Sequence, residues 1–307
     1  MITVVSGGTG SAKLVRGLAG VTGDLTVISN VGDNIWVHGL YVCPDIDTVM
    51  YALGGILDEN RGWGIRGDTF NFLDQMEKYG HPTWFSLGDR DLATHVARTK
   101  MLDEGRTLSE VTDVLRSQLS VAAKIIPCTD DPLTTTVATD AGVMHLQEFW
   151  VKHRGEPEVT GVSFEGAQSA RPNDDALEAI AHSTAIVIAP GNPVSSIGPI
   201  LAVSGIKTAL EEVREKVIAV SPVIGEKAIS GPALKYMKSL GIENSPVGVA
   251  RYLGKPVGNF VISTSDHALS SKITEFGMKV FETDIIMKDK QGEIALARYL
   301  LDRLEKS

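Results

Sequence analysis

A β-branched run at the N-terminus breaks into glycines and then into a helical pattern, and this constrains the fold more than any other stretch. Residues 2–5 are Ile-Thr-Val-Val, residues 6–11 are Ser-Gly-Gly-Thr-Gly-Ser, and apolar side chains recur at helical spacing over residues 14–18. A strand, a glycine turn and a helix start form an anion site, because glycines allow close backbone approach and the helix start offers unpaired N–H groups. The sequence therefore predicts a strand–turn–helix unit of an α/β fold that holds a phosphate.

The candidate phosphate ligands belong to this turn and to the helix after it. We expect Ser11 to be the N-cap of the helix and Lys13 to add positive charge beside a bound phosphate. The stretch is neither Gly-x-Gly-x-x-Gly nor the Gly-Lys-Ser/Thr of a P-loop, so a tight turn without a ligand is the alternative. The candidate residues are Gly7, Gly8, Thr9, Gly10 and Lys13.

Composition and charge exclude several classes of protein. The chain has 307 residues, 43% of them hydrophobic and 22% charged, as in an ordinary globular protein, and its net charge of −9 argues against broad nucleic-acid binding. No apolar stretch is long enough for a membrane span, and the N-terminus leads directly into a strand instead of a signal peptide. Cys43 and Cys128 have no metal-ligand spacing and suit a reducing compartment, so we expect a cytoplasmic protein without membrane or nucleic-acid partners.

Two further polar sites come at or beyond the end of the second predicted strand. That strand ends in Asn30, which a doubly wound parallel sheet places in its ligand crevice. Asp45 and Asp47 precede a helix that we expect to begin near Val49, and in an extended segment their carboxylates point to one side. Close carboxylates repel each other unless a cation lies between them, and oxygen ligands beside a phosphate suit Mg²⁺. The alternative is that Asp47 or Thr48 caps the helix.

A second dense cluster, Trp-Phe-Ser-Leu-Gly-Asp-Arg-Asp, spans residues 84–91. Aromatic residues lead into a glycine turn that presents charged side chains ahead of a helix over residues 92–102, which favours a site over a solvated turn. Arg90 suits phosphate recognition because its guanidinium donates two parallel hydrogen bonds. A lone histidine in a helix, here His95, is more often structural. Trp63 lies between two glycines and is either a stacking platform for a planar ring or a tryptophan packed under a loop.

An antiparallel insertion is expected in the middle of the chain. Residues 134–138 and 143–150 alternate like a hairpin around a turn at 140–142, so residues 121–170 read as antiparallel. Helical patterns and further strands surround this insertion. The helices are expected at 70–79, 108–119 with a capping box from Thr107 to Glu110, 174–181, 233–239, 247–253 and 291–305, and the strands at 123–127, 217–220 and 261–264.

A second anion-binding loop follows the buried strand predicted over residues 185–189. The loop offers Gly191, Asn192 and Ser196 beside a helix start. Because two such loops on one parallel sheet flank its crevice, they suit a nucleotide diphosphate that lies across it.

Taken in order, these motifs resemble the CofD family, the 2-phospho-L-lactate transferases and their bacterial counterparts in coenzyme F(420) synthesis. The resemblance covers almost the whole chain. Together the motifs are specific for this family, whereas no single one of them is. They are Ser-Gly-Gly-Thr-Gly at 6–10, Pro-Asp-Ile-Asp-Thr at 44–48, Leu-Gly-Asp-Arg-Asp at 87–91, Asp-Asp-Pro at 130–132, His-Leu-Gln-Glu-Phe-Trp at 145–150, Gly-Asn-Pro-x-x-Ser-Ile-Gly-Pro at 191–199 and Ser-Pro-Val-Ile-Gly at 221–225.

The resemblance implies one Rossmann-like α/β domain over residues 1–307, a mostly parallel sheet with helices on both faces and an antiparallel and helical insertion at roughly 57–175 that contributes to the acceptor site. It implies Mg²⁺, a homodimer, and transfer of a phosphorylated three-carbon acid from a guanosine diphospho donor to the ribityl hydroxyl of 7,8-didemethyl-8-hydroxy-5-deazariboflavin, with GMP released. The family contacts its acceptor through the second aspartate of Pro-Asp-x-Asp-Thr, here Asp47, and through a position that is often basic. That position is Ser86 in this chain, a departure that leaves the second contact open.

Attack of an alcohol on a diphosphate requires charge neutralisation and an in-line arrangement. We therefore assign Asp45 and Asp47 to Mg²⁺, directly or through water, with one of them near the attacking hydroxyl, and Arg90 to the charge of the transition state. The residues expected to bind the donor are Gly7, Gly8, Thr9, Gly10, Lys13, Asn30, Gly191, Asn192 and Ser196. Those expected to bind the acceptor are Asp47, Thr48, Ser86, Trp63 and Asp89.

Two other classes of function stay open from the sequence. A related gluconeogenesis-factor group shares the glycine start but binds nucleotide sugars as a regulator. A dinucleotide-dependent redox enzyme needs a third glycine after Gly10 and an acid where this chain has Asn30. Lactate, enolpyruvate and glycerate differ so little that no motif identifies the three-carbon acid.

Overall fold

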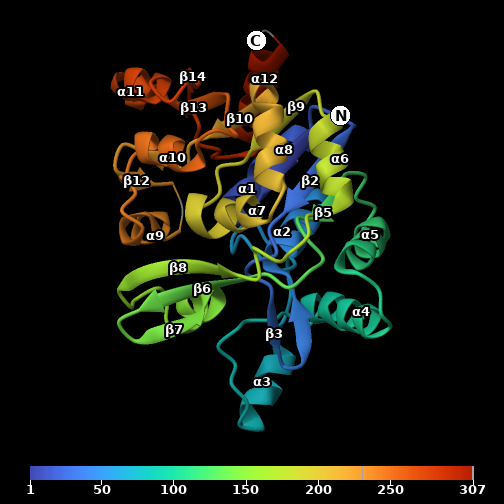
Figure 1. The fold of residues 1–307 in the computed structure, drawn as a ribbon. Coiled ribbons are helices and arrows are strands. Elements are labelled where there is room, and N and C mark those ends of the chain that lie inside the picture. Colours follow the sequence, from blue (N-terminus) through green and yellow to red (C-terminus); the bar gives the residue numbers. More distant parts are fainter. Residues whose placement is uncertain (230, 306–307) are drawn as a thin grey trace.

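A parallel sheet of seven strands forms the centre of the molecule (Figure 1). The computed structural model describes residues 1–229 and 231–305, and every neighbouring pair of strands in this sheet runs parallel. The predicted α/β class is therefore confirmed. In sheet order the strands are β14 (Lys279–Thr283), β13 (Asn259–Ser263), β10 (Val217–Val220), β9 (Ala185–Ile188), β1 (Ile2–Ser6), β2 (Leu25–Ser29) and β5 (Lys124–Pro127).

The strand order reverses beside β1. After β1 the chain builds outward through β2 to β5, and it then returns to place β9 on the other side of β1. Val5 pairs with Ile28 of β2 and with Ile188 of β9, and all three side chains are buried. Such apolar runs suit strands that are covered on both faces. The loops after β1 and β9 lie side by side at this switch point, which is where parallel sheets bind ligands.

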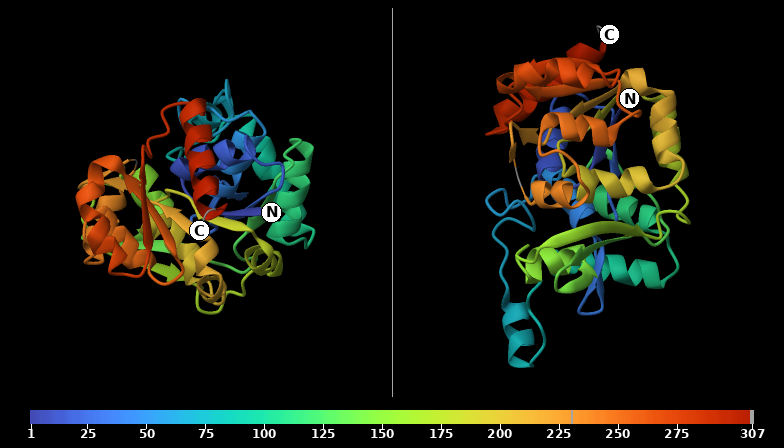
Figure 2. Two further views of the ribbon diagram at one scale, coloured as in Figure 1. Left: turned by 90° about the horizontal axis from the view of Figure 1, so that it is seen from above. Right: turned by 60° about the vertical axis from the view of Figure 1, so that its left-hand side comes forward.

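Helices cover both faces of the sheet (Figures 1 and 2). One group packs around the first helix, and a second group follows β5 and β9. The first consists of α1 (Thr9–Ala19), α2 (Pro44–Leu53) and α12 (Lys290–Glu305). The second includes α6 (Asp174–His182), α7 (Gly198–Ala202) and α8 (Ile206–Glu212). The remaining helices are α4 (Asp91–Asp103), α5 (Leu108–Gln118), α9 (Ala233–Ser239), α10 (Pro246–Leu253) and α11 (Ser270–Thr274).

Most sequence-based helices are confirmed to within a few residues at each end. The capping box is present, since the Thr107 hydroxyl accepts from the Glu110 N–H and the Glu110 carboxylate accepts from the Thr107 N–H. Ser11 is not the N-cap of α1, because the helix begins two residues earlier, after Gly8. The Ser11 hydroxyl donates instead to the carbonyl of Gly7 at 2.6 Å.

The antiparallel insertion is smaller than predicted. It consists of β6 (Thr134–Thr139), β7 (Gly142–His145) and β8 (Val159–Glu165), while β5 is the parallel edge of the main sheet. The second hairpin strand ends at His145, and Glu148–Lys152 forms a π-helical turn in place of a strand. The range 57–175 is therefore not one continuous insertion, because β5 interrupts it.

Several shorter elements lie outside the main sheet. A hairpin of β3 (Ile35–Val37) and β4 (Leu40–Val42) follows β2, and α3 (Asn71–Lys78) stands away from the body (Figure 2). The others are β11 (Val223–Ile224), β12 (Lys227–Ala228), η2 (Pro193–Ile197), η3 (Arg214–Lys216) and η4 (Thr264–Leu269). Within the described residues no single helix is long and apolar enough to cross a membrane, and only Pro193–Ala202 with Ile206–Glu212, bent by 89°, reach that length and composition as a pair.

Candidate active site

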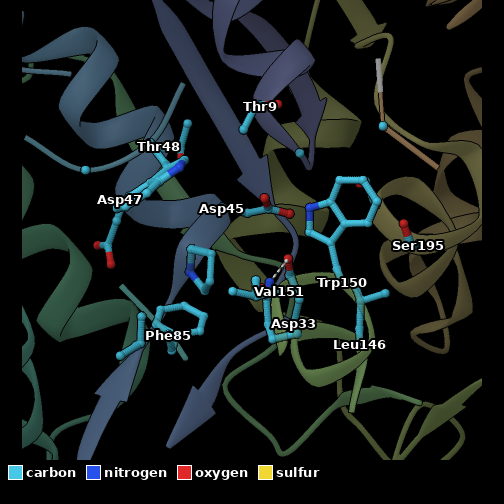
Figure 3. A pocket seen from close by; sticks show the side chains of 18 of the residues that line it. Thr9, Asp33, Asp45, Asp47, Thr48, Phe85, Leu146, Trp150, Val151 and Ser195 are labelled. Atoms are coloured by element: carbon cyan, nitrogen blue, oxygen red, sulfur yellow. Dashed lines mark hydrogen bonds between the residues drawn. The ribbon is translucent and has the colours of Figure 1, made fainter. Parts of the chain in front are cut away.

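A cavity of about 480 Å³ lies at the switch point, beyond the ends of β1 and β9 (Figure 3). It brings together residues from the first turn, from α2, from the loop before α4 and from the loop after β9. The predicted residues that line it are Gly8, Thr9, Gly10, Asp45, Asp47, Thr48, Trp63, Ser86, Gly191, Asn192 and Ser196. The sequence analysis missed a further group that also lines it, namely Asp33, Tyr51, Phe85, Leu146, Gln147, Trp150 and Tyr236.

The two glycine loops touch backbone to backbone at one end of the cavity. A Cβ on Gly191 would lie 2.3 Å from the carbonyl oxygen of Gly7, and a Cβ on Gly7 would lie 2.5 Å from that of Ser196. Gly8 has a φ of 78° and α1 starts directly after it without a side-chain cap. The first N–H groups of α1 therefore face the cavity as an open anion site.

Asn192 shapes the second loop. Its side-chain oxygen accepts from the N–H groups of Val194 and Ser195, at 3.0 and 3.2 Å. Its amide nitrogen is buried and has no hydrogen-bond partner within the described residues. A buried donor of this kind on a cavity wall is satisfied by an acceptor on a bound ligand.

Replacement of Gly191 by alanine is expected to close this end of the cavity. The added methyl group would meet the Gly7 carbonyl at 2.3 Å, so the two loops must separate, at a cost of about 1–3 kcal/mol in stability. We expect GDP to bind at least tenfold more weakly in a calorimetric titration. Gly23→Ala is the matched control, because a Cβ on Gly23 meets nothing within 4 Å. GDP affinity within twofold of the wild type would show that the loop contact does not form the site.

Asp45 and Asp47 diverge, contrary to the prediction from an extended segment. Pro44 is the first residue of α2, so both aspartates lie in the first turn of a helix. Side chains two positions apart on a helix point in different directions, and Figure 3 shows the two carboxylates turned away from each other. The structure therefore does not bring this pair together.

Asp45 meets Asp33 instead. The Asn30 amide nitrogen donates to Asp33 Oδ1 at 2.7 Å and to Asp45 Oδ2 at 3.0 Å, and Gln147 donates to Asp33 Oδ2 at 3.2 Å. Burial and the neighbouring Asp45 carboxylate raise the pKa of Asp33 well above its ordinary value, and burial raises the pKa of Asp45. Two buried carboxylates beside an anion site form a place where a cation would relieve their repulsion.

Asp47 faces a buried arginine. Arg98 is fully buried in α4, and its two terminal nitrogens bind the two carboxylate oxygens of Asp47, with Nη1 to Oδ2 at 3.1 Å. Burial alone would lower the pKa of Arg98, but Asp47, together with Cys43 and Tyr51, outweighs it and the pKa lies above its ordinary value. Asp47 is thus fixed in place, because both of its carboxylate oxygens accept hydrogen bonds from the Arg98 guanidinium.

Five predicted residues, Gly7, Lys13, Asn30, Asp89 and Arg90, lie outside the lining. Asp89 accepts from Thr69 and Asn71 and from the N–H of Phe72, which lowers its pKa to about 2 and ties it to the start of α3. Arg90 and Lys13 are exposed, and Lys13 Nζ lies 3.5 Å from the Met287 carbonyl. Asn30 is wholly buried behind the two carboxylates. Direct contacts of these side chains with substrate stay predictions.

Trp63 packs against an arginine and borders the cavity, while its stacking on a planar ring of the acceptor stays a prediction. The Arg61 guanidinium lies over the Trp63 ring, 5.1 Å from its centroid, and 5.0 Å from the ring centroid of Phe70. Trp63 also lines the main cavity and, with Arg61 and Ser86, a second cavity of about 420 Å³ next to α3. The tryptophan is therefore packed by an arginine and borders the site at the same time.

Known proteins resemble this chain over almost its full length. A family model described as "2-phospho-L-lactate transferase CofD" matches residues 2–299. The chain is 41% identical to a "2-phospho-L-lactate transferase" from Methanopyrus kandleri over 99% of this chain and 97% of the other. It is 39% identical to a "Phosphoenolpyruvate transferase" from Streptomyces griseus over 99% and 98% of the two chains. A UPF0052-family protein from Bacillus halodurans shares the fold, with a TM-score of 0.64, 16% identity and 98% of both chains covered.

Proposed function

This chain belongs to the 2-phospho-L-lactate transferase (CofD) family, and we propose that it transfers a phosphorylated three-carbon acid from a guanosine diphospho donor to the terminal ribityl hydroxyl of 7,8-didemethyl-8-hydroxy-5-deazariboflavin, with release of GMP. The observation that carries the proposal is that one cavity contains both the uncapped N-terminus of α1 and the buried carboxylates of Asp33 and Asp45. A diphosphate binds at such a helix N-terminus, and a divalent cation binds to such a pair of carboxylates.

The donor binds at the glycine end of the cavity. The backbone N–H groups of Gly8, Thr9 and Gly10 cradle the diphosphate, and the unpartnered amide nitrogen of Asn192 donates to the donor from the opposite loop. These contacts are made largely by backbone and amide donors, so they bind charge without needing a lysine in the site.

Asp33 and Asp45 are the residues that would hold Mg²⁺. Within the described residues no cluster of three or more histidine, cysteine or acidic side chains exists that could bind a metal. Two carboxylates are nevertheless enough for Mg²⁺, which takes its other ligands from phosphate and water. When bound, the cation neutralises charge on the transferring phosphoryl group. We therefore propose Asp33, in place of Asp47, as the second metal-binding carboxylate, because Asn30 joins Asp33 and Asp45.

Asp47 orients the acceptor. Its carboxylate, fixed by Arg98, accepts the hydrogen bond of an acceptor hydroxyl. The hydroxyl oxygen then forms a bond to the phosphorus that carries the three-carbon acid, the bond from that phosphorus to GMP breaks with its electron pair staying on the GMP oxygen, and the hydroxyl proton passes to solvent water. The apolar wall of Phe85, Leu146 and Trp150 excludes water that would otherwise compete as the nucleophile.

A turnover assay tests this function and identifies the three-carbon acid. Purified protein, Mg²⁺ and deazariboflavin are mixed in turn with the lactyl, enolpyruvyl and glyceryl guanosine diphosphates, and GMP and the phosphorylated product are followed by mass spectrometry. We expect product with one of these donors, and the activities for which the relatives are named favour lactate or enolpyruvate. A folded protein that binds a nucleotide sugar but forms no product with any donor would favour the regulatory alternative. The homodimer and the cytoplasmic location stay predictions.

A further inference from the structure

A second carboxylate faces the acceptor end of the cavity. Asp91 is the last residue of Leu-Gly-Asp-Arg-Asp and the first of α4, and it lines the cavity together with Asp47 and His95. The sequence analysis assigned the acceptor to Asp89 in this motif, but Asp89 is tied to the start of α3. Asp91 is the aspartate of the motif that reaches the cavity.

His95 lies buried between Asp47 and Asp91. Arg98 Nη1 lies 3.2 Å from His95 Nδ1, and a guanidinium only donates, so Nδ1 is the acceptor in this contact. His95 Nε2 lies 3.3 Å from Asp91 Oδ1, and His95 Nδ1 lies 3.7 Å from Asp47 Oδ2. The imidazole therefore fills the space between the two carboxylates and holds them apart.

One oxygen of Asp91 is occupied and the other is not. Oδ1 accepts from the Tyr51 hydroxyl at 2.6 Å, and His95 Nε2 lies 3.3 Å from it. Oδ2 has no side-chain or backbone donor within the described part of the chain, and it faces Gly64, whose absent Cβ would lie 3.8 Å away. Burial would raise the pKa of Asp91, but its neighbours His95, Tyr51 and Arg98 together outweigh it, so the pKa lies below its ordinary value. Oδ2 is therefore an open acceptor on the cavity wall.

We infer that Asp91 binds a hydroxyl of the acceptor's ribityl chain beside the hydroxyl bound by Asp47, with His95 and Tyr51 as its positioning residues. This inference rests on the proposed function. The carboxylates of Asp47 and Asp91, on either side of the His95 ring, are two hydrogen-bond acceptors in fixed positions. They favour a ligand with several hydroxyl groups along a chain, such as a polyol. They repel phosphate, so the donor cannot occupy this end.

The test is Asp91→Asn, assayed with deazariboflavin and with analogues that each lack one ribityl hydroxyl. We expect the KM for the acceptor to rise at least tenfold, with the KM for the donor and kcat changed less than threefold. One deoxy analogue should be a poor substrate of the wild type and equal to the full acceptor in the variant, because the hydroxyl it lacks has lost its partner. Asp103→Asn, an exposed aspartate in the last turn of the same helix, is the matched control.

Calorimetric titration of the acceptor without donor separates this inference from the proposed function. A wild type that binds deazariboflavin but transfers nothing refutes the transferase, while weaker binding by Asp91→Asn still upholds the role of Asp91. Equal binding by wild type and variant, or no binding by either, overturns that role. If Asp91→Asn does not fold, Tyr51→Phe removes one hydrogen bond from Oδ1 and is expected to weaken acceptor binding about threefold to tenfold, with unchanged binding as the contrary result.

Discussion

Asp33→Asn is expected to lower kcat at least 100-fold while it raises the melting temperature of the metal-free protein. The activity falls because one of the two carboxylates that would hold Mg²⁺ is lost, and a metal at a phosphoryl group is worth several kcal/mol in the transition state. The stability rises because an amide at this position no longer repels Asp45 inside the fold. Turnover at saturating substrate and thermal unfolding without Mg²⁺ measure the two effects.

The pH dependence of stability gives the same prediction an independent test. The pKa of Asp33 is raised in the folded state, so its contribution to stability is fully present below the ordinary aspartate pKa of 3.8 and is lost as pH rises through the higher folded-state value. Asp45 acts in the same direction. The metal-free wild type should therefore lose stability as pH rises through this window, Asp33→Asn should lose less, and Mg²⁺ should restore stability to the wild type alone.

Asp103→Asn serves as the control for charge in general, because Asp103 is exposed. It should leave both kcat and the melting temperature of the metal-free protein near those of the wild type. A kcat within tenfold of the wild type in Asp33→Asn would remove Asp33 from the metal site. A lower melting temperature would show that the hydrogen bonds from Asn30 and Gln147 to Asp33 stabilise the fold more than the repulsion between Asp33 and Asp45 destabilises it.

The sequence predicted those parts of the site that local chemistry determines. The glycine turn after β1 and the loop after β9 both follow apolar β-branched strands, so their place at the sheet edge needs no knowledge of distant contacts. The failure at Asp45 and Asp47 is also local. Pro44 at the first helical position, followed by acidic residues, is a helix-start signal that the extended interpretation overlooked.

The pairs that define the chemistry depend on tertiary structure. Asp33 lies 12 residues before Asp45, and they meet only because β2 lies next to β1 and α2 packs on α1. The one available signal was Asn30-x-x-Asp33 in the same loop after a strand. Arg98 reaches Asp47 across 51 residues, and no spacing in the sequence indicates that contact. Ion pairs of this range follow from the packing of α4 against the β3–β4 hairpin.

Arg98→Met is expected to destabilise the protein by about 3–5 kcal/mol, the second largest effect that the structure implies. Removal of one partner of a buried ion pair leaves the other as an uncompensated charge, and here Asp47 would stay buried without its guanidinium. His95 Nδ1 would lose its donor at the same time. Chemical denaturation measures the free energy of unfolding, and Arg171→Met, which breaks the pair of an exposed arginine with Asp131, should cost no more than about 1 kcal/mol.

The double variant Asp47→Asn/Arg98→Met tests whether the unpaired Asp47 carboxylate or lost packing accounts for the destabilisation by Arg98→Met. If the cost of Arg98→Met comes from the orphaned carboxylate, neutralising Asp47 should recover part of the lost stability, so the two substitutions should be strongly non-additive. Acceptor binding should not recover, because the fixed carboxylate that accepts the hydroxyl is absent. Additive losses would mean that Arg98 stabilises α4 mainly through packing. Asp47 would then be oriented by its place in the first turn of α2 and not by the guanidinium.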